Sequence, residues 1–143
     1  MLFRSERLTG SAFNDMLTGR AGDNVLKGLA GADVLTGGVG ADRFDFDAVG
    51  DSFGNTGTTR DTISDFNESE LDKIDLSTID ANGSGAGNGK FTFVAAFGAN
   101  ATGQLRFDAA THHVLGSIDA DNFPEFSILL TGTSSMTGSN FIL

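Results

Sequence analysis

Residues 37–45 read GGVGADRFD, and the spacing of their glycine, aspartate and phenylalanine recurs along the first third of the chain. Large apolar residues follow one another at steps of nine, at Leu8, Leu17, Leu26, Leu35, Phe44 and Phe53. Two residues before each lies an oxygen-bearing side chain, at Glu6, Asp15, Asn24, Asp33, Asp42 and Asp51. Seven residues before four of them lies a glycine, at Gly10, Gly19, Gly28 and Gly37. A period of nine fits neither an amphipathic helix nor a heptad, so it predicts a solenoid.

Each unit of nine divides into a turn and a short strand whose central apolar side chain points inward. Two units complete one coil, so residues eighteen apart are expected to stack in register. The stacked pairs are then Asp15 with Asp33, Asn24 with Asp42, and Asp33 with Asp51. Stacked strands lie ~4.8 Å apart, where two facing carboxylates repel by roughly 3–4 kcal/mol at an effective dielectric constant of about 20. A divalent cation would convert this repulsion into attraction, and the turn glycines would let backbone carbonyls reach it.

The motif Gly-Gly-x-Gly-x-Asp-x-apolar-x, which residues 37–45 match in full, resembles the calcium-binding repeat of the RTX family. Residues 28–36 and 19–27 match in part, and residues 10–18 carry Phe13 in place of a glycine. The resemblance implies an all-β protein with a parallel β-roll that binds several Ca²⁺ ions. Its candidate ligands are turn carbonyls and side chains of the repeats, namely Asp15, Gly19, Ala21, Asn24, Gly28, Ala30, Gly31, Asp33, Gly37, Gly38, Val39, Gly40 and Asp42. A solenoid with ordinary Gly/Asp turns is the alternative.

Residues 51–77 resemble the junction between the roll and the terminal β-domain of serralysin-type metalloproteases, through the strings DTISDF at 61–66 and DKIDLS at 72–77. The resemblance implies that Asp51, Asp61 and Asp72 complete the last calcium sites. Together with Asp33 and Asp42, Asp51 is expected to be among the best side-chain ligands. The predicted domains are a calcium-binding β-roll at 1–58 and a small antiparallel β-domain at 59–143.

Two further aspartates of this junction, Asp65 and Asp75, are expected to cap turns or to lie at the surface. From Lys90 onward, alternating apolar residues predict antiparallel strands, among them 126–130 and a final strand at 141–143.

The C-terminal residues 139–143 are also similar to serralysin-like tails, which carry an uncleaved signal for type I secretion. They keep the apolar end of such tails and lack the acidic residue. The resemblance implies a secreted protein of a Gram-negative bacterium, exported by type I secretion machinery without a cleaved N-terminal signal. The chain would follow an upstream catalytic or toxin domain, and the parent protein could be a zinc metallopeptidase. The absence of cysteine leaves bound metal as the source of added stability outside the cell.

Composition excludes several functions. The formal net charge of −10 argues against a nucleic-acid partner, and no apolar run is long enough to span a membrane. The two histidines, His112 and His113, are adjacent and expected in a surface turn, and no HExxH or GxSxG motif occurs. We therefore expect a non-catalytic module, with no calcium loop at Asp119 and Asp121. The alternatives are an extracellular polysaccharide-binding β-roll and, less favoured, an enzyme that uses unfamiliar carboxylate chemistry.

Overall fold

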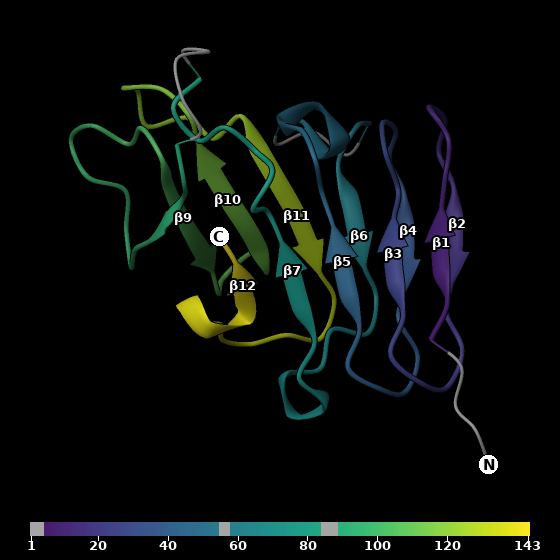
Figure 1. Ribbon diagram of the computed structural model, residues 1–143. Helices are drawn as coiled ribbons and strands as arrows, with labels where there is room; N and C mark the ends of the chain where they lie inside the picture. Colours follow the sequence, from purple (N-terminus) through teal and green to yellow (C-terminus); the bar gives the residue numbers. More distant parts are fainter. Residues whose placement is uncertain (1–4, 55–57, 84–88) are drawn as a thin grey trace.

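The protein is built of two facing β-sheets, which contain every strand of its described residues, 5–54, 58–83 and 89–143 of the computed structural model (Figure 1). The smaller sheet has the order β1 (Arg7–Thr9), β3 (Val25–Lys27), β5 (Arg43–Asp45), β7 (Lys73–Asp75) and β12 (Phe141–Ile142). The larger sheet has the order β2 (Met16–Thr18), β4 (Val34–Thr36), β6 (Asp61–Ile63), β11 (Phe126–Leu130), β10 (His113–Ser117), β9 (Gln104–Asp108) and β8 (Thr92–Phe93). The predicted all-β fold is confirmed.

The repeats form a parallel roll in which consecutive strands alternate between the two sheets. Leu8 lies beside Leu26 in the smaller sheet, and Leu17 lies beside Leu35 in the larger one. Each central side chain points between the sheets, as an inward-facing position of a strand must. The predicted stacking of residues eighteen apart is therefore confirmed for the strands of residues 7–45.

The nine-residue rhythm ends at Phe44, and the prediction that Phe53 continues it is wrong. Phe53 is 53% exposed and makes an isolated bridge to Phe126. The chain instead forms the 3₁₀ helix η1 (Val49–Ser52) after Phe46, and the next strand begins only at Asp61. The next inward positions are Ile63 and Ile74, which pair with Leu35 and Phe44.

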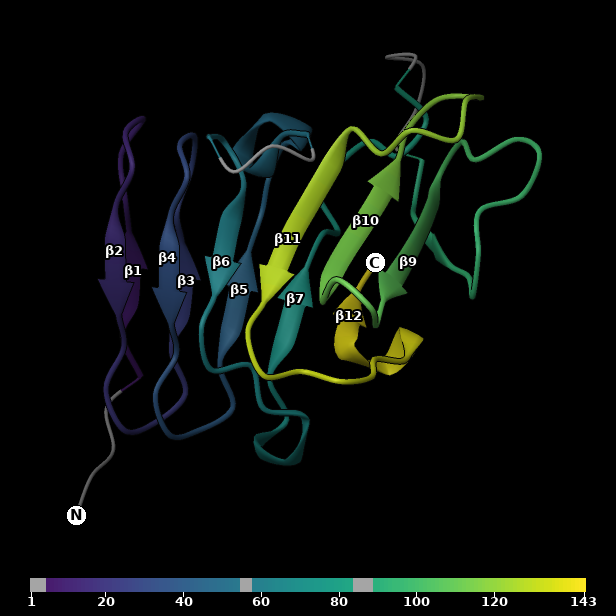
Figure 2. The ribbon, with the colours of Figure 1, turned by 180° about the vertical axis from the view of Figure 1, so that it is seen from behind.

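The C-terminal strands extend both sheets of the roll. β9, β10 and β11 are antiparallel, as predicted, but β8 pairs in parallel with β9, against the prediction. β11 also pairs in parallel with β6, and β12 pairs in parallel with β7 (Figure 2). Two further 3₁₀ helices, η2 (Glu68–Glu70) and η3 (Gly138–Asn140), lie in the connections. Because both sheets run across residue 58, the roll and the C-terminal strands share a core; the division into two domains stays a prediction.

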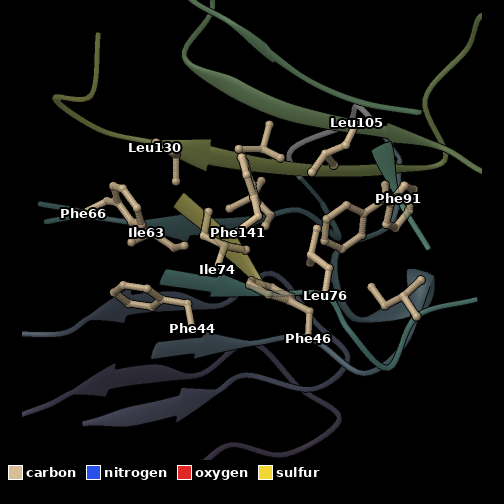
Figure 3. Packing of buried hydrophobic residues seen from close by; sticks show 14 of the residues in the cluster. Phe44, Phe46, Ile63, Phe66, Ile74, Leu76, Phe91, Leu105, Leu130 and Phe141 are labelled. Carbon is tan, nitrogen blue, oxygen red and sulfur yellow. The ribbon is translucent and has the colours of Figure 1, made fainter. Parts of the chain in front are cut away.

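Aromatic and aliphatic side chains fill the space between the sheets where the two parts meet (Figure 3). The ring of Phe46 meets that of Phe126 edge-on at 5.6 Å between centroids. Burial decreases toward the N-terminal end of the roll, where Phe13 and Met16 are each 78% exposed. No helix within the described ranges is long and apolar enough to cross a bilayer.

Candidate calcium-binding edges of the roll

The turns between strands line up along two opposite edges of the roll. We call the edge with turns 10–15 and 28–33 and residues 46–54 the first edge, at the top of Figure 1, and the edge with turns 19–24, 37–42 and 64–72 the second edge, at the bottom. Of the predicted turn residues, the first edge carries Gly28, Ala30 and Gly31. The second edge carries Gly19, Ala21, Gly37, Gly38, Val39 and Gly40. The structure thus brings the predicted residues together in two groups.

On the first edge, the side chain of one aspartate accepts a hydrogen bond from the backbone N–H of the aspartate in the preceding coil. The Asp15 N–H donates to Asp33 Oδ1 at 2.7 Å, and the Asp33 N–H donates to Asp61 Oδ1 at 2.8 Å. The Asp61 N–H donates in turn to Ser52 Oγ at 2.9 Å. The predicted pairing of Asp33 with Asp51 is therefore wrong, because Asp61 at the start of β6 occupies that position.

The second edge repeats this arrangement with one asparagine. The Asn24 N–H donates to Asp42 Oδ1, and the Asp42 N–H donates to Asp72 Oδ1, both at 2.8 Å. The Glu6 N–H ends the series on Asn24 Oδ1 at 3.2 Å. We call these two series the aspartate ladders; they contain Asp15, Asp33 and Asp61, and Asn24, Asp42 and Asp72. The Asn24–Asp42 pairing is as predicted.

In the part of the chain that the structure describes, the second oxygen of three ladder carboxylates is buried without a partner. Asp33 Oδ2, Asp42 Oδ2 and Asp61 Oδ2 accept no hydrogen bond within the described part of the chain. Each of these side chains is at most 1% exposed. A buried carboxylate oxygen that accepts nothing is strongly unfavourable unless a cation neutralises it. Hard oxygen donors of this kind fit Ca²⁺, so the residues present suit the predicted ion.

Asn24 shows how the same position is satisfied without a charge. Its Nδ2 lies within 2.6–3.1 Å of four oxygens: Arg20 O, Gly22 O, Gly37 O and Asp42 Oδ1. Carbonyl and carboxylate oxygens from two neighbouring turns therefore converge beside this ladder position. An amide supplies N–H donors to them, whereas an aspartate there would need a cation.

Glycines at the start of each turn make room for the ladder side chains. A Cβ atom on Gly28 or Gly37 would overlap Asp33 Oδ2 or Asp42 Oδ2, respectively. The fourth turn position also needs glycine, since Gly31 has φ +143° and Gly40 has φ +135°. Both requirements follow from the close approach of stacked turns.

Burial raises the pKa values of the ladder carboxyls. It raises the pKa of Asp61 to about 8 and that of Asp72 to about 6, although hydrogen bonds from backbone N–H groups act in the opposite direction. Burial also raises the pKa of Asp33 and of Asp42. Negative charge on the ladders is thus unfavourable by itself, which is the electrostatic condition for binding a cation.

Asp51 lies at the first edge outside the ladder. Its Oδ2 accepts the N–H groups of Asp47 at 2.8 Å and Ala48 at 3.1 Å, and its charge contributes to the raised pKa values of Asp33 and Asp61. Asp51 is therefore close enough to the first ladder to act with it. Its role as a ligand stays a prediction.

The other two junction aspartates cap turns, as expected. Asp65 accepts the N–H groups of Gly37 and Gly38, each at 2.8 Å. Asp75 Oδ1 accepts the Ser77 N–H at 3.0 Å.

Sequence reasoning missed a second set of links between coils. Asn14 Oδ1 accepts the Ala32 N–H at 2.9 Å, and Asp23 Oδ1 accepts the Ala41 N–H at 3.0 Å. Both acceptors lie one residue before a ladder position. Oxygen-bearing side chains at this position of the nine-residue repeat could therefore have revealed these links in the sequence. Ser52, which ends the first ladder, had no such signal.

Outside the roll, carboxylate oxygens of Asp119, Asp121 and Glu125 lie within 4.8 Å of one another on a surface loop. Asp119 and Asp121 accept the N–H groups of Asp121 and Phe123, and Glu125 accepts that of Ile118. These bonds account for the gathering of the three side chains. That this loop holds no calcium stays a prediction.

Comparison with known proteins places the roll in a family. Residues 9–44 and 18–52 match the model of the RTX calcium-binding nonapeptide repeat, in four copies. Residues 9–52 of this chain therefore carry RTX repeats. As RTX repeats, they bind Ca²⁺ and form a non-catalytic module, as predicted.

Solved structures agree with this assignment. The AlgE6R3 subunit of the Azotobacter vinelandii mannuronan C5-epimerase is 28% identical, with a TM-score of 0.56 over 96% of this chain and 77% of that one. The AlgE6R2 subunit of the same epimerase is 25% identical, with a TM-score of 0.61 over 96% of this chain and 86% of that one. The search of curated proteins gave no match.

Proposed function

We propose that this RTX module is a calcium-triggered folding unit of a secreted protein. The observation that carries the proposal is the set of buried oxygens on Asp33, Asp42 and Asp61 that have no partner among the described residues. Where free calcium is scarce, these carboxylates oppose closure of the roll. Outside the cell, calcium at tens to hundreds of times its dissociation constant would stabilise the roll by about 2–3 kcal/mol per site.

The ladders also link calcium to the C-terminal strands. Asp61 begins β6, which pairs with β11, and Asp72 directly precedes β7, which pairs with β12. Ions held by Asp33 with Asp61, and by Asp42 with Asp72, would therefore fix the strands on which β11 and β12 assemble. The turn carbonyls of residues 28–31 and 37–40 would complete the oxygen ligands.

A calcium titration of the chelated protein, followed by far-UV circular dichroism with magnesium as control, tests this proposal. We expect a cooperative gain of β-signal with Ca²⁺ and none with Mg²⁺, because a ring of carboxylates and carbonyls suits the larger, more flexible ion. A fully folded spectrum in chelator that ignores calcium would contradict the folding switch.

The proposed place of the module is the C-terminal end of an exported protein. The similarity of residues 51–77 and 139–143 to serralysin-type proteins supports a type I secretion route from a Gram-negative bacterium. An upstream catalytic or toxin domain, such as a zinc metallopeptidase, would be the cargo. Appending the chain to a passenger in cells with a type I exporter tests this role; removal of residues 139–143 should then abolish export.

Binding of an extracellular polysaccharide is a second candidate function. It is favoured by the two similar structures, which are subunits of an enzyme named for the polysaccharide mannuronan. Retention of the calcium-loaded protein on a column of immobilised acidic polysaccharide, compared with a neutral one, tests this candidate. Equal elution from both columns would remove it.

A further inference from the structure

The outer face of the larger sheet carries a pocket with two guanidinium groups, in a chain whose formal net charge is −10. Its lining residues are Arg60, Arg106, Thr111, His113, Leu115 and Pro124. None of them belongs to an aspartate ladder or to the predicted calcium ligands. The pocket therefore calls for a ligand of its own.

Strand pairing brings the two arginines to one face. Arg106 of β9 lies opposite Leu115 of β10, and Leu115 lies opposite Ser127 of β11. Asp61 at the start of β6 pairs with Ile128, so the preceding residue, Arg60, lies beside Ser127. Arg106, Leu115, Ser127 and Arg60 thus form one row across the sheet. The four strands lie side by side in the near layer of Figure 2. The pocket forms only when β6 has joined β11, that is, in the folded protein.

Neighbouring groups hold Arg106 in place. Its Nη2 lies 3.5 Å from Asp108 Oδ2, and its guanidinium carbon lies 5.1 Å from the centre of the Phe97 ring. Its side chain is still 27% exposed. A guanidinium fixed by an ion pair and an aromatic ring loses little freedom on binding, and it can still donate to an incoming acceptor.

His113 adds an unused hydrogen-bonding atom to the pocket. Its Nε2 is buried and has no partner among the residues that the structure describes. Burial and the nearby Arg60 charge lower the pKa of His113, which favours the neutral form of its ring. A neutral ring offers one hydrogen bond at this atom, and a polar ligand would satisfy it.

We propose that this pocket binds the carboxylate of a single uronate unit, a sugar that carries a carboxyl group. The guanidinium fork of Arg106 matches the planar carboxylate, and the apolar side chains of Leu115 and Pro124 suit the C–H face of a sugar ring. The choice of a uronate as the ligand rests on the second candidate function, polysaccharide binding. The binding of an anion by this pocket does not depend on the proposal of calcium-triggered folding.

Nuclear magnetic resonance of the ¹⁵N-labelled, calcium-loaded full chain tests the proposal, with D-galacturonate as probe and D-galactose and sulfate as controls. Galacturonate should cause saturable shifts at Arg106, His113 and Leu115, and the controls should cause none. Arg106→Ala should weaken binding by about tenfold to a hundredfold, since it removes a charge-assisted hydrogen bond. Arg20→Ala is the control, because it changes the net charge by the same amount at a side chain on the roll that is 81% exposed. This variant should bind galacturonate as tightly as the unaltered chain does.

Several outcomes would overturn the proposal. They are the absence of shifts with galacturonate, equal shifts with galactose or sulfate, and unchanged affinity of a folded Arg106→Ala variant. If that variant fails to fold, Arg106→Lys keeps the charge without the fork and should bind several-fold more weakly. Dispersion of the spectrum before any sugar is added reports calcium-dependent folding separately, and column retention reports polysaccharide binding by any other surface.

Discussion

Asn24 and Asp42 are stacked on each other and satisfy equivalent ladder positions in different ways. Asn24 Nδ2 contacts four oxygens, whereas Asp42 Oδ2 has no partner in the described residues. A single exchange between amide and carboxylate therefore changes whether the position is satisfied by the chain or by an ion. Two predictions follow from this pair at the scale of single residues.

Asp42→Asn is expected to make folding less dependent on calcium. The amide removes a buried negative charge, so the calcium-free fold should gain about 1–3 kcal/mol. The calcium concentration at the folding midpoint should rise at the same time, because a strong ligand is lost. Urea unfolding in chelator and a calcium titration measure the two effects. Glu68→Gln, at an exposed position, is the one-charge control; an unmoved calcium midpoint in Asp42→Asn would refute the ligand role.

Asn24→Asp is expected to do the reverse. It places a carboxylate oxygen against the oxygens that Nδ2 now contacts, so the calcium-free fold should lose roughly 1–3 kcal/mol. In calcium, the same oxygens could hold one more ion than in the unaltered chain. Native mass spectrometry or calorimetry should show this additional ion. An unchanged number of ions, with a folded protein, would show that the second ladder has no site at this coil.

At the scale of elements, the turns matter as much as the strands. Turn 28–33 is tight enough that Gly28 leaves room only for the Asp33 side chain. Gly28→Ala should therefore destabilise the calcium-loaded protein by about 1–3 kcal/mol, because overlapping atoms must move apart. Gly50→Ala is the matched control, since its Cβ would meet nothing within 4 Å. Urea denaturation compares them; equal midpoints would mean that the turn adapts freely.

The sequence predicts the elements well wherever its period holds. Strands β1 to β5 follow from the nine-residue spacing, and β11 coincides with the apolar residues 126–130. The connections after Phe46 and after Ile63 break the spacing, so counting eighteen residues finds Asp15 beside Asp33 and Asn24 beside Asp42 but misses their next partners, Asp61 and Asp72. The parallel pairing of β11 with β6 and of β12 with β7 joins residues far apart in the chain, and only the folded core determines it. The pocket of Arg60, Arg106 and His113 depends on this pairing and left no local signal.

At the scale of the whole molecule, the two ladders run along opposite edges of one shared core. Asp33 and Asp61 act at the first edge, and Asp42 and Asp72 at the second edge. Each ladder crosses from the repeats into the strands that carry the C-terminal sheet. Neutralising the ladders should therefore stabilise the roll and the C-terminal strands together, whether the neutralising cation is Ca²⁺ or a proton.

Protons should accordingly replace part of the effect of calcium. Burial raises the pKa of Asp61 to about 8 and that of Asp72 to about 6, so the folded chain binds more protons than the unfolded chain between about pH 4 and pH 8. In chelator, the free energy of unfolding should thus fall as the pH rises through this window. The lowered pKa of His113 makes the free energy of unfolding rise with pH instead. His113 is a single group, and the two aspartates outweigh it.

Urea midpoints in chelator at pH 5 and pH 8 measure this dependence, and the midpoint should be higher at pH 5. In saturating calcium the order should reverse, because protons then compete with Ca²⁺ for the same carboxylates. Asp61→Asn removes the most strongly shifted group and should flatten the dependence in chelator. A chelated protein that is more stable at pH 8 than at pH 5 would mean that the ladder charges are satisfied without any cation, and calcium would then have no electrostatic penalty to relieve.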